Sequence, residues 1–192
     1  MCSRKAADAD ALTALFNSLF SDAENTELEG GADEPLYEPG NDVAPAKIYF
    51  RADYAASALH EVAHWCIAGA ERRRVTDYGY WYSPDGRDAE AQRRFLQVES
   101  QPQALEWAFS QACGRDFRLS LDNLDAQTDS QDQRDFADAV CEEAVRVKEG
   151  VLSERAQRFL NALAAEFRSD DLGRAGNDPL ALLQFNRTEL DA

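Results

Sequence analysis

The chain has 192 residues, 44% of them hydrophobic and 10% aromatic, which is enough for one domain with its own core. Its 36 acidic and 20 basic residues give a formal net charge of −16. This charge disfavours electrostatic binding to nucleic acid or to anionic membranes, whereas a cationic substrate would be attracted.

The first part of the chain predicts one helix followed by short strands. Large apolar residues recur at helical spacing between residues 10 and 20: Leu12, Leu15, Phe16, Leu19 and Phe20. An acidic segment with several glycines and prolines follows, and short strands could lie there at residues 26–29 and 36–37. Residues 47–50, Lys-Ile-Tyr-Phe, are a better strand candidate directly after Pro45.

The next predicted helix runs from Tyr54 to Gly69 and carries the only two histidines of the chain. His60 and His64 stand four residues apart in the sequence His-Glu-Val-Ala-His, so a helix places both imidazoles on one face. This HExxH pattern is typical of helical metal sites. We therefore predict that His60 and His64 bind a metal ion, with Glu61 nearby as a base or as support for the ligands.

The remaining elements are predicted to be mainly helical. The basic run at residues 72–74 is typical of a solvated helix end, and docking to an acidic protein partner is the alternative. An aromatic strand candidate covers residues 77–82 and closes in a turn. Two helices divided at Pro102 are expected at residues 89–100 and 102–113, then a short strand at 117–119. Further helices are expected at residues 132–149 and 153–168, and a last short one from Asp178.

Two histidines bind a metal weakly, and without a third histidine a carboxylate must complete the site. Glu99 falls three residues after Leu96, on an apolar helical stripe, where an ionised carboxylate is costly unless a cation or hydrogen-bond donors compensate it. Glu99 is therefore the predicted third ligand, although burial against an arginine or tyrosine is an alternative. Glu106 is the reserve candidate, as a ligand or as a supporting group.

The four cysteines offer no competing site. Cys2, Cys66, Cys113 and Cys141 are scattered and form no CxxC pair, so neither a four-cysteine zinc site nor a disulfide framework is indicated. The N-terminus has no apolar signal region, and no stretch of the chain reaches membrane-spanning length. We expect a cytoplasmic protein that binds neither nucleic acid nor membrane.

The predicted ligand set does not choose one chemistry. His60, His64 and Glu99 form a 2-His-1-carboxylate set, which serves non-haem Fe(II) oxygenases with open positions for O₂ and substrate. The same set serves zinc metallopeptidases and other hydrolases, in which Glu61 would be the general base that activates water. A third possibility is a non-catalytic acidic interaction protein whose fold the metal braces.

Three stretches of the sequence are more distinctive than the histidine motif alone. They are residues 58–69 (ALHEVAHWCIAG), 78–88 (YGYWYSPDGRD) and 98–107 (VESQPQALEW). Together with residues 33–37 and 122–124, they resemble the bacterial elongation factor P hydroxylase family over roughly residues 33–124.

The resemblance implies hydroxylation of the lysine of elongation factor P that already carries a β-lysyl group. It implies His60, His64 and Glu99 as metal ligands, with Glu61 matched but less certain in role. Fe(II) with O₂ is the expected pair, although zinc or another divalent metal could occupy the site in a crystal, and no motif indicates an organic cosubstrate such as 2-oxoglutarate.

The resemblance and the predicted elements together favour a single α+β domain over residues 1–192. We expect a small mixed sheet packed by several helices, one of which carries the HExxH motif. Residues 33–124 would hold the metal-site core, and residues 130–192 would form a helical C-terminal part.

A β-lysylated lysine carries ammonium groups, which acidic side chains would bind. Acidic residues that flank the motif are candidates for this contact: Asp53, Asp77, Asp85 and Asp88. For Asp85 and Asp88, roles in a turn and as a helix cap are the alternative. The aromatic residues between 78 and 82 could stack on a cation or pack in the core.

Overall fold

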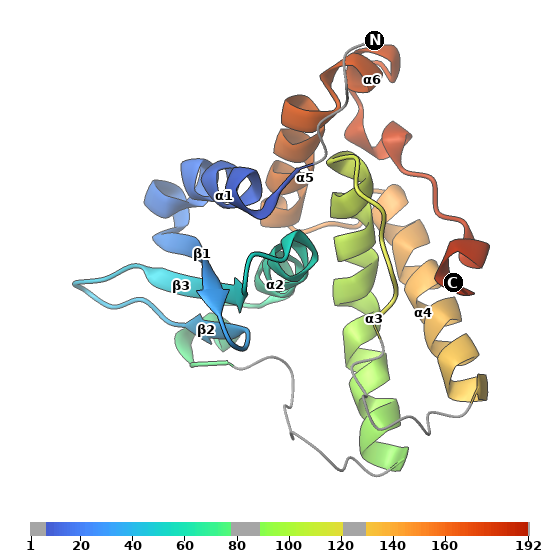
Figure 1. Ribbon diagram of the computed structural model, residues 1–192, viewed down its shortest axis with the longest axis horizontal. Coiled ribbons are helices and arrows are strands. Elements are labelled where there is room, and N and C mark those ends of the chain that lie inside the picture. Colours follow the sequence, from blue (N-terminus) through green and yellow to red (C-terminus); the bar gives the residue numbers. More distant parts are fainter. Residues whose placement is uncertain (1–6, 78–88, 121–129, 192) are drawn as a thin grey trace.

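The computed structural model describes residues 7–77, 89–120 and 130–191 and shows a mixed α+β arrangement (Figure 1). A small sheet and helix α1 (Ala9–Glu24) lie on one side of helix α2 (Ala55–Ile67). The long helices α3 (Ala89–Ala112) and α4 (Ser130–Lys148) lie on the other side. The predicted α+β class is confirmed, and the histidine-bearing helix α2 is its central element.

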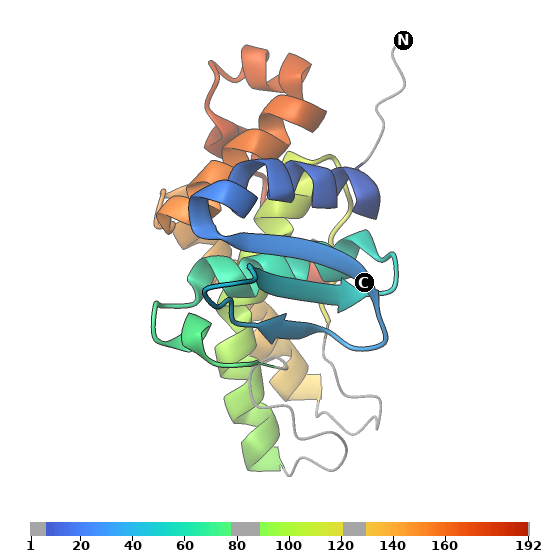
Figure 2. The same cartoon turned by 90° about the vertical axis from the view of Figure 1, so that its left-hand side faces the viewer.

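The sheet has three strands in the described part of the chain, in the order β1-β3-β2. Strand β1 (Thr26–Ala32) pairs with β3 (Ala46–Arg51) in parallel, and β2 (Leu36–Glu38) pairs with β3 in antiparallel orientation. Figure 2 shows the sheet in front of α2, with α1 along the β1 edge. The side chain of Asn17 on α1 forms two hydrogen bonds, of 3.1 and 2.7 Å, with the carbonyl and amide groups of Leu28. These two backbone groups at the edge of the sheet therefore have hydrogen-bond partners.

Alternation along β3 explains how the sheet meets α2. Ala46, Ile48 and Phe50 are buried and belong to one face of the strand, because successive side chains point to opposite faces. Ile48 and Phe50 join the same core cluster as the apolar face of α2. The strand candidate at residues 47–50 is therefore confirmed, and β3 packs against the histidine-bearing helix α2.

Helix α5 (Glu154–Phe167) holds the C-terminal end of α2. The Arg155 guanidinium donates to the carbonyl oxygens of Trp65, Cys66 and Ala68 at 3.1, 3.2 and 2.7 Å, and it lies 4.8 Å from the centroid of the Trp65 ring. These carbonyls are among those that the end of a helix leaves unpaired. Ser153 caps α5 and also donates to the Cys66 carbonyl at 2.8 Å.

Helix α3 is continuous through Pro102, so the expectation of two separate helices is wrong. Proline removes one backbone hydrogen bond, to the carbonyl of Val98, but the residues after it are buried against neighbouring helices. Gln103, Ala104 and Leu105 are each no more than 3% exposed, and this packing outweighs the local preference of proline. The continuous helix carries both Glu99 and Glu106 toward α2.

The segment after α3 also differs from expectation. Residues 115–120 form no strand; instead Phe117 stacks on Trp107, with ring centroids 5.6 Å apart and an interplanar angle of 20°. The Gln103 side chain exchanges hydrogen bonds of 2.6 and 3.0 Å with the Ser120 backbone. These contacts tie the segment along α3 rather than to the sheet.

A second apolar cluster lies between α3 and α4. Its larger buried members are Leu96, Trp107, Phe136, Val140 and Leu190. Shorter elements complete the described chain: 3-10 helices η1 (Arg72–Arg74), η2 (Pro179–Leu182) and η3 (Arg187–Asp191), and helix α6 (Ser169–Arg174), which was not predicted. Within the described ranges, no helix is both long and apolar enough to cross a membrane.

Candidate metal centre

The two histidines lie on the side of α2 that faces α3, and their side chains are close neighbours. The Nε2 atoms of His60 and His64 are 3.0 Å apart, and the ring planes are tilted by 71°. On α3, Oε2 of Glu99 lies 3.5 Å from Nε2 of His60 and 3.2 Å from Nε2 of His64. The structure thus brings together the three residues that sequence analysis selected as ligands.

Glu99 is buried, with 3% of the residue exposed. Burial alone would raise the pKa of its carboxyl group, but interactions with His64 and His60 outweigh burial and lower the pKa well below its usual range. The described contacts of Glu99 do not support the alternative of an arginine or tyrosine partner, because its carboxylate faces two imidazoles.

Glu106 lies two helical turns beyond Glu99 on α3 and contacts Nδ1 of His60, the ring nitrogen that does not face Glu99. Nδ1–H of His60 donates to Oε2 of Glu106 at 2.9 Å, which leaves Nε2 of His60 directed at His64 and Glu99. Burial lowers the pKa of His60, but hydrogen bonds to Glu106 and Glu99 dominate and raise it well above its usual value. Glu106 is therefore outside the three-residue cluster and orients one member of it.

The donor atoms suit a small divalent cation. Metal–ligand distances of about 2.0–2.2 Å at tetrahedral or octahedral angles separate neighbouring donors by roughly 2.8–3.6 Å. The three measured separations, 3.0, 3.2 and 3.5 Å, fall within this range. A hydrogen bond to a carboxylate on the second ring nitrogen is also the usual environment of a metal-binding histidine. The residues present therefore fit a metal ion.

Glu61, which sequence analysis selected as catalytic, lies beside the cluster rather than within it. Among the described residues, no hydrogen bond or ion pair reaches its carboxylate, although the side chain is partly buried. Burial raises the pKa of Glu61, and the nearby His60 and His64 oppose this rise. Its side chain borders a pocket instead.

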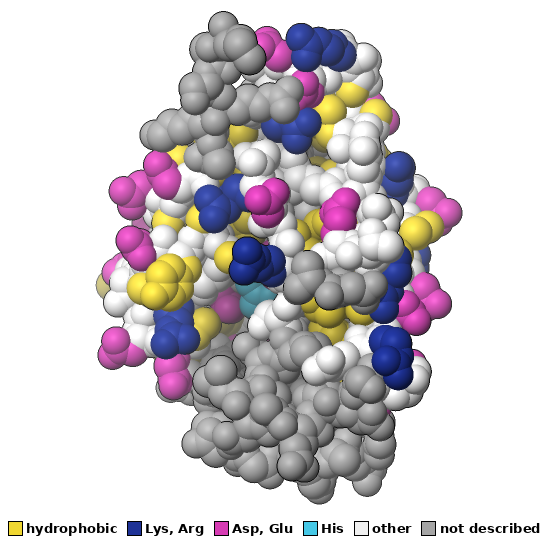
Figure 3. All heavy atoms as spheres, turned by 45° about the vertical axis from the view of Figure 1, so that its right-hand side comes forward, with side chains coloured by type: hydrophobic (Ala, Val, Ile, Leu, Met, Phe, Trp, Pro, Cys, Tyr) yellow, Lys and Arg dark blue, Asp and Glu magenta, His cyan; other side chains and the backbone are white. Residues whose placement is uncertain are grey.

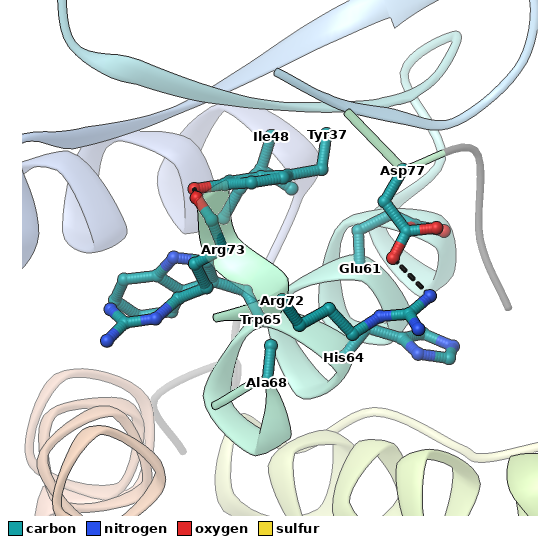
Figure 4. A pocket seen from close by; sticks show the side chains of 9 residues that line it. All are labelled: Tyr37, Ile48, Glu61, His64, Trp65, Ala68, Arg72, Arg73 and Asp77. Atoms are coloured by element: carbon teal, nitrogen blue, oxygen red, sulfur yellow. Dashed lines mark hydrogen bonds and ion pairs between the residues drawn. The ribbon is translucent and has the colours of Figure 1, made fainter. Parts of the chain in front are cut away.

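This pocket lies between α2, the sheet and η1, and Figure 4 shows the side chains that line it. They are Tyr37, Ile48, Glu61, His64, Trp65, Ala68, Arg72, Arg73 and Asp77. His64 belongs both to the donor cluster and to this lining, so the pocket adjoins the candidate metal centre.

Sequence analysis did not identify Tyr37, Arg72 or Arg73 as pocket residues. Tyr37 and Asp77 form an isolated antiparallel bridge with backbone hydrogen bonds of 2.7 and 3.0 Å, which brings η1 to the edge of β2. Such a long-range pairing has no local signal in the sequence. Arg72 pairs with Asp77, and Arg73 pairs with Glu24 at 3.3 Å, so neither is merely a solvated helix end.

The other candidate substrate contacts have mixed outcomes. Asp77 lines the pocket, whereas Asp53 is exposed and does not line it. Asp85, Asp88 and the aromatic residues at 78–82 lie outside the described residues.

A second hollow reaches Glu106 where the start of α2 lies near α3 and the segment that follows it. It is lined by Ala56, Glu106, Gly114, Arg115, Asp116 and Arg118. Figure 3 shows a histidine side chain in a recess of the molecular surface, with an acidic side chain beside it and a basic one above it. The candidate centre is therefore close to the surface even though Glu99 is buried.

The chain is similar to a known protein family and to a named protein. A family described as "Elongation factor P hydroxylase" matches residues 15–176, which include all the residues of the donor cluster and of the pocket. A protein of Haemophilus influenzae named elongation factor P lysine hydroxylase is 45% identical over 161 residues, which span 83% of this chain and 89% of that protein.

Proposed function

The chain belongs to the elongation factor P hydroxylase family, and on this premise we propose that it hydroxylates the β-lysylated lysine of elongation factor P. The observation that carries the proposal is the cluster of His60, His64 and Glu99, whose donor atoms converge next to a pocket. The name of the Haemophilus influenzae relative supports elongation factor P as the substrate and lysine as the modified residue. The β-lysyl group is the more specific part of the proposal.

We propose Fe(II) as the metal, held by His60, His64 and Glu99. Bound Fe(II) would supply the activation of O₂, so that R–H, O₂, two electrons and two protons give R–OH and water. The electrons come from a reductant that the reaction requires in addition to the protein substrate.

The surrounding residues fix the ligands. Glu106 accepts a hydrogen bond from Nδ1–H of His60, which keeps the proton on Nδ1 and leaves the lone pair of Nε2 directed at the metal position. Glu99 brings one negative charge into a buried place, where it favours a divalent cation over water. We propose that Glu61 contacts the substrate rather than the metal, because it lines the pocket and lies outside the donor cluster.

A zinc metallopeptidase would use the same three ligands, with Glu61 as general base for water. Membership of a hydroxylase family favours oxygen insertion over hydrolysis. The non-catalytic alternative is disfavoured for the same reason.

The direct test is the intact mass of elongation factor P before and after reaction. The enzyme is loaded with Fe(II) without oxygen, mixed with β-lysylated or unmodified elongation factor P and a panel of reductants, and exposed to air. We expect one added oxygen atom on the β-lysylated form, and tandem mass spectrometry should place it on the modified lysine.

His64→Ala should abolish this mass change, whereas Glu142→Gln, which removes an exposed carboxylate on α4, should leave it unchanged. Unchanged substrate mass with every reductant, at confirmed Fe(II) occupancy, would contradict the proposal. Cleavage of the peptide chain or loss of the β-lysyl group would instead favour a hydrolase.

A further inference from the structure

Glu61 lines the pocket beside the donor cluster, and its carboxylate has no hydrogen bond or ion pair with any residue that the structure describes. From this we infer that Glu61 is the residue that recognises the substrate, by binding an aliphatic ammonium group of the side chain to be hydroxylated. The inference rests on the proposed function, because it takes the substrate of that reaction to be the occupant of the pocket.

The charges that line the pocket otherwise cancel in pairs. Arg72 forms an ion pair with Asp77, which Figure 4 shows as a dashed line. Arg73 pairs with Glu24, which lies outside the lining, at 3.3 Å. Within the part of the chain that the structure describes, Glu61 receives neither a hydrogen bond nor an ion pair. The pocket therefore has room for one additional positive charge.

An unpaired carboxylate in a partly buried position is costly, and a cationic ligand would remove that cost. An ammonium group donates hydrogen bonds and brings a full charge, so it satisfies a carboxylate better than a neutral ligand does. A carboxylate or phosphate ligand would add repulsion instead. The chemistry of the pocket thus favours a cationic hydrogen-bond donor such as an ammonium group.

The position of Glu61 relative to the donor cluster suits this role. Glu61 and His64 are three residues apart on α2, so their side chains are neighbours on the helix surface, and both line the pocket. An ammonium group held by Glu61 would therefore place the methylene groups next to it on the side of His64. Binding at this residue sets which carbon lies near the metal centre.

The rest of the lining suits the aliphatic part of such a chain. Ile48 and Ala68 contribute apolar surface, and Trp65 and Tyr37 contribute aromatic side chains. The hydroxyl of Tyr37 already donates to the carbonyl of Arg73 at 3.0 Å, so the ring is held in place. An alkyl chain with a terminal amine matches this combination of one charge and apolar walls.

The test measures binding without turnover. Full-length elongation factor P is prepared by semisynthesis with the acceptor lysine carrying either β-lysine or a hexanoyl group, which has the same chain length but no amines. Dissociation constants are measured with Fe(II)-loaded enzyme in the absence of oxygen. We expect the wild-type enzyme to prefer the β-lysyl form by about 10- to 100-fold, as for hydrogen bonds to a charged group.

Glu61→Gln keeps the size of the side chain and removes its charge. It should reduce the preference to nearly one while leaving the affinity for the hexanoyl form unchanged. Glu61→Asp, which keeps the charge on a shorter side chain, should retain part of the preference. Asp116→Asn, a loss of one carboxylate in the other hollow, should leave the preference at the wild-type value.

An unchanged preference in Glu61→Gln would overturn the inference, as would equal weakening of both forms or no preference in the wild-type enzyme. Circular dichroism and metal content of each variant verify that it is folded and loaded. If the wild-type preference for the β-lysyl form is lost in Glu61→Gln but the wild-type enzyme adds no oxygen to that form in air, the inference is upheld and the proposed hydroxylation is contradicted.

Discussion

Nδ1 of His60 lies 2.9 Å from Oε2 of Glu106, while Nε2 of the same ring lies 3.5 Å from Oε2 of Glu99. Two carboxylates of one helix therefore contact opposite nitrogens of one imidazole. A ring held at both nitrogens has a fixed orientation and a defined tautomer when Nε2 binds a metal. The contact also separates the roles of the two glutamates, because Glu99 lies among the donor atoms whereas Glu106 contacts His60 at its other ring nitrogen.

We expect Glu106→Gln to weaken Fe(II) binding by about 10- to 100-fold, because His60 loses a charged acceptor. Competition with a chromophoric chelator measures the dissociation constant. The matched control is Glu142→Gln, which removes an exposed carboxylate on α4. Equal metal affinities in Glu106→Gln and wild type would show that the contact does not support the ligand.

Glu99→Gln should weaken metal binding more than Glu106→Gln does, by more than about 100-fold, because it removes a proposed ligand rather than its support. The same competition titration ranks the two variants. Retention of an intact near-ultraviolet spectrum would show that the packing around α3 survives. The reverse order of affinities would make Glu106 the ligand and Glu99 the supporting residue.

The metal-free protein should lose stability as the solution becomes alkaline. Burial lowers the pKa of His60, but its hydrogen bonds to Glu106 and Glu99 outweigh this and raise the folded-state pKa well above 6.5. The pKa of a histidine in the unfolded chain is about 6.5, so the raised folded-state pKa stabilises the protein fully below about pH 6.5. This stabilisation is lost as the pH rises through the folded-state pKa. Urea unfolding of the chelated protein at a series of pH values should show this decline.

His60→Gln removes the titrating group, so the decline should be smaller in that variant. Metal binding should depend on pH in the opposite direction, because protons compete with the metal for His60, and affinity should rise with pH. If the stability of the metal-free protein is constant or increases from neutral to alkaline pH, the folded state does not raise the pKa of His60.

Arg155→Lys should destabilise the protein by about 1–3 kcal/mol. In the wild-type protein, the Arg155 guanidinium donates to three carbonyl oxygens at the end of α2 and lies over the Trp65 ring. Lysine keeps the charge but cannot reproduce this geometry. Chemical denaturation gives the change in the free energy of unfolding. Arg146→Lys, at an exposed position with an ion pair to Glu143, should change it far less.

Thiol reactivity should differ sharply among the described cysteines, which are all free. Cys66 and Cys113 are buried, and burial raises the pKa of both thiols, that of Cys113 to about 12. Cys141 is only partly buried. A thiol-specific reagent on the native protein should therefore modify Cys141 well before the other two, as peptide mass spectrometry can measure. Equal rates would indicate that the core opens easily.

The local patterns of the sequence were sufficient for most of the elements around the site. Helical spacing of apolar residues identified α1, α2, α4 and α5, and the apolar stripe near Leu96 indicated that Glu99 points inward. These predictions succeeded because each depends on the period of one element. The spacing of His60 and His64 belongs to the same class of signal.

Other features depend on contacts between distant parts of the chain. The continuity of α3 through Pro102 is set by burial of the following turn, which a local rule for proline does not include. The arrival of Arg72 and Arg73 at the pocket follows from the bridge between Tyr37 and Asp77. The different contacts of Glu99 and Glu106 with the two ring nitrogens of His60 also depend on how α2 and α3 pack together.

Two of the three donor side chains come from a single turn of α2, whereas the third comes from α3. The imidazole pair can therefore form as soon as α2 is helical, but the carboxylate arrives only when the two helices dock. An ion held by all three would cross-link two helices that pack in the same core cluster. Its occupancy would add to the stability of the docked state.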